Sequence, residues 1–263
     1  MKIVVCIKQV PNTTETKINP NTNTFIREGV ESTINSFDYY AIEEGLRLKE
    51  KYGGTVTVIS MGPPQSIKAL REALSYGIDN AVLLSCKQFA GADTLATSYT
   101  LATAIKKMDA DIILLGKQTS DGNTGQVGPQ LAEFLNIRHI TNICGVERVN
   151  KGESVIIEKL IEDGVLVLKS NLPIVLTVIK DINKPRFPTL KGRIRAKKID
   201  IPIWDADSMI FDPGKIGING SPTTVQKIFR PSNIGGKGKI FAGTLEENVE
   251  NLLYELRNDR KVL

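Results

Sequence analysis

The chain has very few residues of the two types that most often carry metal and nucleophilic chemistry. Its 263 residues include one histidine, His139, and three cysteines, Cys6, Cys86 and Cys144, which lie far apart and form no C-x-x-C pair. A zinc site built from histidines, a Ser-His-Asp triad and a two-histidine proton relay are therefore not expected. Cys6 and Cys86 lie in or beside apolar runs, which predicts small buried hydrophobic residues, and His139 is expected to be structural or exposed.

Long hydrophobic runs are also missing. No stretch of 18 apolar residues occurs, so no membrane-spanning helix and no membrane insertion are predicted. The first residues run straight into a strand pattern at 3–7 without the apolar core of a signal peptide. With three scattered cysteines, this predicts a cytoplasmic protein in a reducing compartment. Since no metal site is expected, redox chemistry would have to come from an organic cofactor.

The net charge of +5 is concentrated in one segment. Residues 180–200 hold eight Lys or Arg and two Asp, a local charge of +6, so the rest of the chain is nearly neutral. No ladder of aromatic residues is interleaved with these basic ones, which disfavours stacking on nucleic-acid bases. A docking site for an acidic protein surface and a solvated loop are the two interpretations left open, and no nucleic-acid partner is expected.

Short apolar runs alternate with helical patterns over the first 180 residues. Runs at 3–7, 55–60, 81–84, 112–115 and 174–179 are continuously apolar, which is typical of parallel strands covered on both faces. Helical patterns lie between them at 38–52, 65–76 and 93–108 and from Thr124 onward, with Asp38 as the expected N-cap of the first. The sequence therefore predicts an α/β fold with a doubly wound, mostly parallel sheet.

The second half of the chain contains two departures from this alternation. Residues 146–170 are expected to form an antiparallel insert with a turn at Glu162-Asp163-Gly164. After Pro202, glycine and proline recur, and a last helical pattern spans 245–257. We predict a Rossmann-like nucleotide-binding domain over residues 1–202 and, over residues 203–263, an extended arm with a terminal helix that packs on another chain. An irregular extension over its own domain is the alternative.

Polar, glycine-rich loops come after three of the predicted strands. Ligands of open α/β sheets bind beyond the carboxyl ends of the strands. At these positions the sequence has K-Q-V-P-N-T from Lys8, G-A-D-T-L-A-T-S from Gly91 and G-K-Q-T-S-D-G-N-T-G-Q-V from Gly116. Two of the loops lead into helices, whose free N–H groups favour phosphate. Neither a Walker A motif nor a G-x-G-x-x-G turn is present, so the residues predict nucleotide binding, with ordinary caps and turns as the alternative.

The same loops carry a resemblance to a known family. Over essentially its full length the chain resembles the β subunit of electron transfer flavoproteins. The resemblance rests on ordered segments: V-C-I-K-Q-V-P-N-T, I-N-S-F-D-Y-Y-A-I-E-E-G, V-I-S-M-G-P-P-Q, A-D-T-L-A-T-S, the long loop from Gly116, L-P-I-V-L-T-V-I-K, K-P-R-F-P-T-L and G-I-N-G-S-P-T. Asn12 departs from the family's pattern, in which Asp often comes after Val-Pro, and this weakens any assignment to Asn12.

The resemblance implies a heterodimer whose α subunit carries one FAD. Housekeeping members of the family hold AMP in the crevice of the β subunit. Electron-bifurcating members hold a second FAD there, which takes a hydride from NADH and divides the electrons between ferredoxin and, through the α-subunit FAD, a partner flavoprotein dehydrogenase. The A-D-T-L-A-T-S stretch and the compact loop after Gly116, without the acidic D-D-D of AMP-binding relatives, resemble the bifurcating branch.

The same resemblance implies an activity. The chain would act as a subunit of an electron-bifurcating NADH:acceptor oxidoreductase, with a partner that is acyl-CoA dehydrogenase-like or lactate dehydrogenase-like. No side-chain acid or base catalyst is expected, because the flavin carries the chemistry. A flavin-free nucleotide-binding module in stress response or signalling is the alternative from another class. The arm and the basic segment disfavour that alternative, because a self-contained sensor needs neither.

The resemblance also assigns residues to roles. The adenosine would be edged by Lys8, Gln9, Val10 and Pro11. Ribose and pyrophosphate would be held by Asp121, Asn123, Thr124 and Gln126, with loop N–H groups at Gly116, Gly125 and Val127. The flavin head or the entering nicotinamide would be faced by Asp93, Thr94 and Thr97, and Asp38 would cap the first helix below the crevice. The dehydrogenase partner would be bound by the loop at 183–198, through Arg186, Phe187, Leu190 and Arg193.

Overall fold

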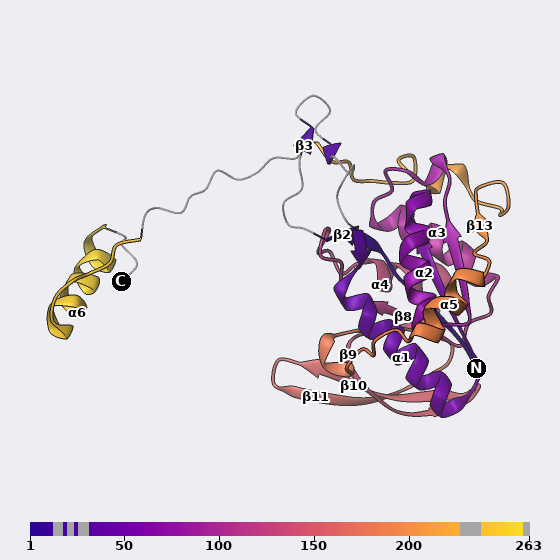
Figure 1. Ribbon diagram of the computed structural model, residues 1–263, viewed down its shortest axis with the longest axis horizontal. Helices are drawn as coiled ribbons and strands as arrows, with labels where there is room; N and C mark the ends of the chain where they lie inside the picture. Colours follow the sequence, from indigo (N-terminus) through magenta and orange to yellow (C-terminus); the bar gives the residue numbers. More distant parts are fainter. Residues whose placement is uncertain (13–17, 20–23, 26–31, 227–237, 260–263) are drawn as a thin grey trace. The chain divides into compact units, whose positions relative to one another are not determined.

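The computed structural model describes residues 1–12, 18–19, 24–25, 32–226 and 238–259 (Figure 1). The chain divides into two compact units, Met1–Gln226 and Lys227–Leu263, termed unit 1 and unit 2. Unit 1 contains the sheet and all of the predicted site residues, and unit 2 contains the terminal helix. Within the described residues, no helix is both long and apolar enough to cross a membrane.

Unit 1 is built on a nine-stranded sheet with a parallel centre. The strand order is β11-β10-β9-β12-β8-β1-β6-β7-β13. The five predicted strands all form and lie parallel to their neighbours: β1 (Lys2–Cys6), β6 (Thr55–Met61), β7 (Asn80–Leu84), β8 (Ile112–Gly116) and β12 (Ile174–Val178). Their side chains are buried on both faces of the sheet, which confirms the prediction made from continuous apolar runs.

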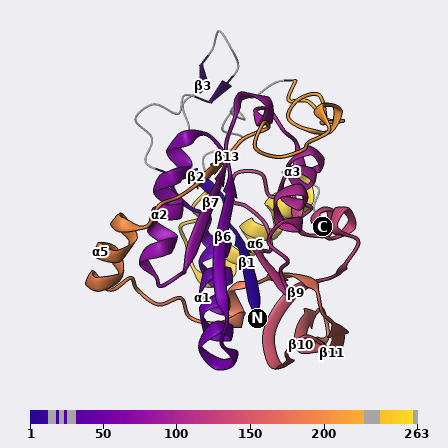
Figure 2. The same ribbon diagram turned by 90° about the vertical axis from the view of Figure 1, so that its right-hand side faces the viewer.

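Two layers of helices cover the parallel centre of this sheet, as Figure 2 shows. Neighbouring strand residues point to opposite faces, so Val5 lies in the core under one pair of helices and Val4 in the core under the other. The first pair comprises α1 (Ser36–Tyr52) and α2 (Ile67–Ser75), and the second comprises α3 (Thr94–Lys106) and α4 (Val127–Leu135). The predicted doubly wound α/β architecture is confirmed.

The predicted antiparallel insert is longer than expected. The strands β10 (Ser154–Ile161) and β11 (Gly164–Asn171) form the expected hairpin, and β9 (Arg138–Asn150) joins it to the parallel sheet beside β12. The first half of β9 was not predicted, because most of its residues are only half-buried. Register shifts in the β9–β10 ladder also interrupt the alternation by which a strand is recognised.

Four short strands lie outside the main sheet. They form two small antiparallel pairs, β2 (Gln9–Pro11) with β5 (Ser32–Ile34) and β3 (Ile18–Asn19) with β4 (Thr24–Phe25). The first pair continues directly from the end of β1. It fixes the direction in which the chain leaves the sheet next to the predicted site.

Part of the basic segment is a helix rather than a loop. The helix α5 (Leu190–Lys198) begins after Thr189, whose hydroxyl caps the Gly192 N–H. Its sequence has little apolar periodicity, and contacts with α2 hold it instead. Arg71 on α2 donates hydrogen bonds to two carbonyl oxygens, Ala196 and Ile199 (both 2.5 Å). Gly192 lies so close to Ser75 that a Cβ there would sit 2.2 Å from the Ser75 carbonyl oxygen.

Residues 203–226 belong to unit 1, so the boundary predicted at residue 202 is displaced to Gln226. The short strand β13 (Ile203–Trp204) extends the sheet beside β7. Met209 and Ile216 are buried in the core that also contains α3 and α4, and Phe211 packs edge-on against Phe89. The sequence did not indicate that these apolar residues are buried, because they have no regular spacing among the glycines and prolines.

Unit 2 contains the predicted terminal helix. The helix α6 (Leu245–Tyr254) begins with a capping box between Thr244 and Glu247 and continues as a π-helical turn, Glu255–Asp259. Its apolar side chains are exposed within the described residues, with Leu245 76% and Val249 48% exposed. Residues 227–237 and 260–263 of the predicted arm lie outside the described residues.

Candidate functional site

The strand order of the sheet reverses between β1 and β8. From β1 the chain proceeds through β6 and β7 on one side and then returns to place β8 on the other. Ligands of open α/β sheets bind outside the carboxyl ends of the strands at such a reversal. Residues 8–11 come after β1 and residues 116–127 begin at the end of β8, so both predicted binding segments start here. We term the region formed by these segments and residues 93–98 the strand-end site.

Asp38 joins the ends of the two strands. Its carboxylate accepts hydrogen bonds from the Lys8 N–H (2.8 Å), the Gly116 N–H (3.2 Å) and Asn35 Nδ2 (3.0 Å). The predicted N-cap role is wrong, because Asn35 precedes α1 and Asp38 lies inside its first turn. Only glycine fits at 116, since a Cβ there would lie 2.4 Å from Asp38 Oδ1.

Asn35 extends this arrangement to the loop after β8. The residue is fully buried, and its side chain donates to the Gln118 carbonyl oxygen (2.9 Å) and accepts from the Ser120 N–H (3.1 Å). Asn35 and Asp38, termed the Asn35–Asp38 hub, therefore connect β1, β8 and the loop after β8. Asn35 was not among the predicted site residues; its one signal was the I-N-S-F-D segment, in which an Asn directly before a helix reads as an ordinary cap.

Burial raises the pKa of Asp38 to about 7, although hydrogen bonds from Lys8, Asn35 and Gly116 act to lower it. Burial, together with the nearby Asp38 charge, also raises the pKa of the Cys6 thiol on β1. Cys6 is thus the protonated, buried residue that was predicted, whereas Cys86 is only half-buried. His139 is exposed on β9.

Lys8 places a cation at the strand-end site. Lys8 Nζ forms an ion pair with Asp121 in the loop after β8 (2.7 Å). Partial burial acts to raise the pKa of Asp121, but the hydrogen bond and charge of Lys8 outweigh it and lower the pKa below its usual value. A bound phosphate group would compete with Asp121 for the Lys8 ammonium.

The loop between β8 and α4 has the backbone of an anion cradle. Asn123 (φ 53°) and Gly125 (φ 65°) adopt left-handed conformations, of the kind found in anion-binding backbone nests. Gln126 directly precedes α4. Its side chain accepts no hydrogen bond from the first N–H groups of this helix. Thr124 is exposed in the same loop. These features match the donor set that a pyrophosphate requires.

The starts of α3 and α4 are tied together. Thr94 Oγ1 donates to Gln126 Oε1 (3.1 Å), and the buried Ser98 hydroxyl bonds the carbonyl oxygens of Thr94 and Val127. Thr97 is half-buried one turn into α3, and its hydroxyl has no hydrogen-bond partner among the described residues.

Asp93 holds both the start of α3 and a segment far away in the chain. One carboxylate oxygen caps α3 by accepting from the N–H groups of Leu95 and Ala96, and the other accepts from the N–H and hydroxyl of Thr223. Its own N–H donates to the Ser221 hydroxyl (2.8 Å). Asp93 thereby attaches residues 221–223 to the strand-end site, and its predicted contact with the flavin head or the nicotinamide stays a prediction.

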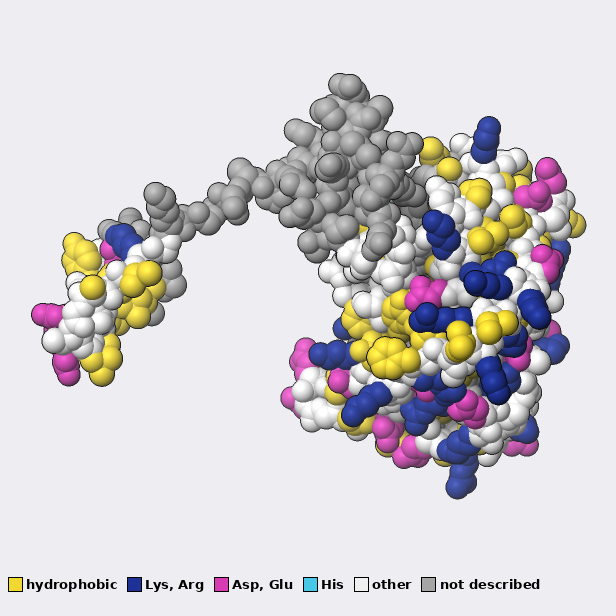
Figure 3. All heavy atoms as spheres, in the orientation of Figure 1, with side chains coloured by type: hydrophobic (Ala, Val, Ile, Leu, Met, Phe, Trp, Pro, Cys, Tyr) yellow, Lys and Arg dark blue, Asp and Glu magenta, His cyan; other side chains and the backbone are white. Residues whose placement is uncertain are grey.

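The predicted partner-binding residues divide into two groups. Phe187 and Leu190 are 92% and 75% exposed, and Arg193 is exposed beside them. Figure 3 shows this face, where hydrophobic side chains lie among Lys and Arg over α5. Arg186 belongs elsewhere, because its guanidinium is paired with Glu43 and Glu50 of α1. Its charge is therefore not directed at a partner.

Comparison with known proteins gives a consistent result. Residues 22–209 match the family model described as "Electron transfer flavoprotein domain". The chain is 47% identical over 264 residues to "Electron transfer flavoprotein subunit beta" of Thermoanaerobacterium thermosaccharolyticum, covering all of both chains. It is 46% identical over 244 residues to the same subunit of Megasphaera elsdenii, covering 90% of each. It is 42% identical over 259 residues to "Caffeyl-CoA reductase-Etf complex subunit CarD" of Acetobacterium woodii, covering 98% of each.

Proposed function

The chain belongs to the electron transfer flavoprotein family, as a β subunit that takes part in electron transfer, and we propose that its strand-end site binds FAD. When bound, FAD would supply the redox chemistry, namely two-electron reduction by NADH and onward transfer of the electrons to ferredoxin and to the FAD of the α subunit. The observation that carries the proposal is the position of the loops at the strand reversal, fixed there by the Asn35–Asp38 hub.

The donor set of the strand-end site fits a nucleotide. Lys8 would provide a cation for a phosphate, while the left-handed loop and the start of α4 would provide backbone N–H groups. The positive ends of the α3 and α4 dipoles both favour negative charge in this region. These residues would bind and orient the cofactor, and no side-chain acid or base takes part in hydride transfer.

One feature favours FAD over AMP. Thr94 and Thr97 are small hydroxyl residues at the start of α3, where a bulky side chain would leave less room for a ring system. The similarity to CarD, whose name places it in a caffeyl-CoA reductase complex, favours a chain that works with a partner flavoprotein dehydrogenase, acyl-CoA dehydrogenase-like or lactate dehydrogenase-like.

Nucleotide counting tests the cofactor assignment directly. The chain is co-purified with its α subunit and denatured, and the released nucleotides are separated and quantified. We expect two FAD per heterodimer. One FAD and one AMP would replace the bifurcating assignment by the housekeeping one, and absence of flavin would reject both.

The loop after β8 is expected to contribute directly to nucleotide affinity. The double variant Asp121→Ala, Thr124→Val removes two polar groups, each worth ~0.5–1.5 kcal/mol, so affinity at the strand-end site should fall about 10- to 100-fold. The measurement is the nucleotide retained after dialysis, with Asp163→Ala in the β10–β11 turn as control. Retention equal to that of the control would reject the assignment of this loop.

Leu190 is proposed to anchor the dehydrogenase partner. The variant Leu190→Ala should lose ~2 kcal/mol of binding, which is roughly a 30-fold weaker interaction. Titration of the heterodimer with the dehydrogenase measures it, and Ile210→Ala is a matched control because Ile210 is 95% exposed and lies outside residues 183–198. Reduction of the heterodimer by NADH should not change. A parallel loss of both activities would make Leu190 a folding residue.

The exposed apolar face of α6 is proposed to pack on the α subunit. Leu245, Val249 and Leu252 recur at helical spacing and are exposed within the described residues. An isolated 10-residue helix is marginal in water. A partner chain would supply the missing apolar surface.

A further inference from the structure

The segment that leads to the exposed Phe187 lies along one face of α1. Arg47 donates to the Ile182 carbonyl oxygen (3.3 Å), and Asn183 Nδ2 donates to the Tyr40 carbonyl oxygen (3.0 Å) and to Glu44 Oε2 (3.1 Å). Positions 40, 43, 44, 47 and 50 of α1 are three or four residues apart, so they form one stripe of the helix. The whole stripe is used to hold residues 182–186.

Arg186 makes the densest set of these contacts. Its Nε and Nη2 donate to the two oxygens of Glu43 (2.8 and 2.9 Å), and its Nη1 and Nη2 donate to the two oxygens of Glu50 (2.5 and 3.0 Å). The Arg186 N–H adds a bond to Glu43 Oε2 (3.1 Å). One guanidinium thus binds two carboxylates in bidentate fashion, a geometry that lysine cannot reproduce.

The burial of Glu43 and the pKa shifts of Glu50 and Arg186 indicate that Arg186 binds the two carboxylates strongly. The Glu43 side chain is only 8% exposed, and it would be an uncompensated buried charge without Arg186. Hydrogen bonds from Arg186 hold the pKa of Glu50 below its usual value. Hydrogen bonds to Glu50 and Glu43 raise the pKa of Arg186.

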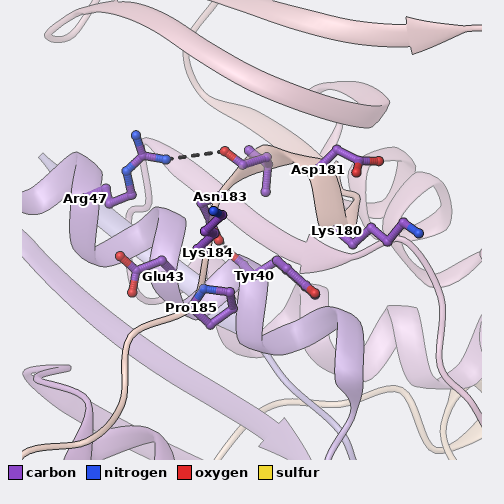
Figure 4. Close-up of a pocket in the computed structure, with 9 residues that line it drawn as sticks. Tyr40, Glu43, Arg47, Lys180, Asp181, Asn183, Lys184 and Pro185 are labelled. Carbon is purple, nitrogen blue, oxygen red and sulfur yellow. Dashed lines mark hydrogen bonds between the residues drawn. The ribbon is translucent and has the colours of Figure 1, made fainter.

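The attachment is not a continuous packed surface. A hollow of about 650 Å³ lies between α1 and residues 180–185, lined on the helix side by Tyr40, Glu43 and Arg47 (Figure 4). At its start the segment is held by Ile182, which is buried in the core, and beyond that residue it is held by discrete polar bonds. Arg186 is the last of these bonds before Phe187.

We propose that Arg186 is a positioning residue: by binding Glu43 and Glu50, it holds residues 183–189 in the conformation that presents Phe187 and Leu190 to the dehydrogenase partner. The inference rests on the proposed docking role of these two residues. The Phe187 and Leu190 side chains are 92% and 75% exposed, and residues 183–189 have no regular secondary structure. The bonds made by Arg186 explain how such a segment keeps these two side chains in a defined position. Preorganising the loop reduces the ordering cost that a partner would otherwise meet on binding.

The test compares Arg186→Met, Arg186→Lys and Arg71→Met in the α/β heterodimer. Arg71→Met is a matched control, because Arg71 anchors the far end of α5 and not the loop. Amide hydrogen exchange is monitored by mass spectrometry for residues 184–190 and 196–200. Reduction of a purified acyl-CoA dehydrogenase-type flavoprotein is measured at its flavin absorbance as a function of its concentration.

For Arg186→Met we expect exchange at 184–190 to be at least tenfold faster. We also expect the KM for the dehydrogenase to rise about tenfold, with kcat and NADH reduction of the heterodimer unchanged. Arg186→Lys should restore part of both effects, and Arg71→Met should affect only 196–200.

Two results would overturn the inference about Arg186 and leave the docking proposal intact, and a third would overturn both. Unchanged exchange at 184–190 in Arg186→Met would overturn the inference. So would faster exchange with an unchanged KM, if Leu190→Ala still weakens coupling. If neither Arg186→Met nor Leu190→Ala alters the KM, the docking role fails, and the inference fails with it.

Discussion

An Asp38→Ala variant is expected to lose about 3–9 kcal/mol of folding free energy, because three buried N–H donors lose their acceptor at ~1–3 kcal/mol each. Two of these donors are the backbone N–H groups of Lys8 and Gly116, at the ends of the strands that flank the strand-end site. The loops after β1 and β8 would lose this connection, and of the contacts described above the Lys8–Asp121 ion pair would remain between them. We therefore expect the purified heterodimer to retain its α-subunit flavin and to lose the nucleotide of the β subunit.

Asp79→Ala is the control for this experiment. The Asp79 carboxylate also accepts a backbone N–H, from Val56 (2.8 Å), and pairs with Lys49, but it lies where β6 begins, at the opposite end of the parallel strands. Its loss should lower the urea midpoint without emptying the strand-end site. Stoichiometric nucleotide in Asp38→Ala, with an unchanged urea midpoint, would show that the hub does not organise this site.

Asp38 should also give the chain an unusual pH dependence. Its pKa is about 7 in the folded chain, against an ordinary value of 3.8 in the unfolded chain, so the folded state binds the proton more tightly. Its contribution to stability is complete below the unfolded pKa and is lost as pH rises through 7, at up to ~1.4 kcal/mol per pH unit. Most carboxylates have the opposite sign, because ion pairing lowers their folded pKa.

Carbon-13 labelling of aspartate carboxyl groups measures this titration directly. One resonance that disappears in Asp38→Asn should titrate with a midpoint near 7. The free energy of unfolding of Asp38→Asn should vary less than that of the unmodified chain between pH 5 and 7. A midpoint near the ordinary aspartate value would mean that the three hydrogen bonds outweigh burial.

Thr97→Phe is expected to abolish reduction by NADH while leaving FAD bound. Thr97 is half-buried one turn into α3, on the helix whose start is fixed to α4 through Thr94 and Gln126, so a phenyl ring there has little freedom to move aside. A misplaced nicotinamide typically costs about 100-fold in hydride transfer. Anaerobic titration with NADH, monitored at the flavin absorbance, measures the effect.

Thr97→Ser, which keeps the hydroxyl and adds no bulk, is the matched control and should behave as the unmodified chain. Turnover with a dehydrogenase substrate and ferredoxin then tests bifurcation itself. Reduction of the substrate without stoichiometric reduction of ferredoxin would restore the housekeeping assignment. Normal NADH reduction in Thr97→Phe would place the nicotinamide elsewhere.

The central strands could be predicted because each contains a run of consecutive apolar residues that are buried. Strands such as β1 and β8 are covered on both faces, so almost every position is apolar and the run is visible without knowledge of neighbours. Helix α5 could not be recognised in this way. Only Ala196 is buried in it, and the helix depends on Arg71, which lies more than a hundred residues earlier in the chain.

The location of the site was accessible from sequence, but its internal organisation was not. The strand-end rule pointed to the segments beginning at Lys8 and Gly116, and both lie at the strand reversal. The roles of Asn35 and Asp38 depend on which groups their buried side chains meet, and a local pattern shows only that both stand near a helix start. The pairing of Arg186 with Glu43 and Glu50 could not be predicted for the same reason, since nothing near Arg186 in sequence indicates these two residues.

Asp93 and Thr223 are 130 residues apart, yet the carboxylate of one is held by the N–H and hydroxyl of the other. In evolutionary terms, a substitution at Asp93 or at Thr223 therefore affects the contacts of the other residue. A change at position 93 removes the cap of α3 and at the same time detaches the last stretch of unit 1 before unit 2 begins. Substitutions at 93, 221 and 223 should therefore arise together among related chains, and a lineage that alters one alone should show a compensating change in this stretch.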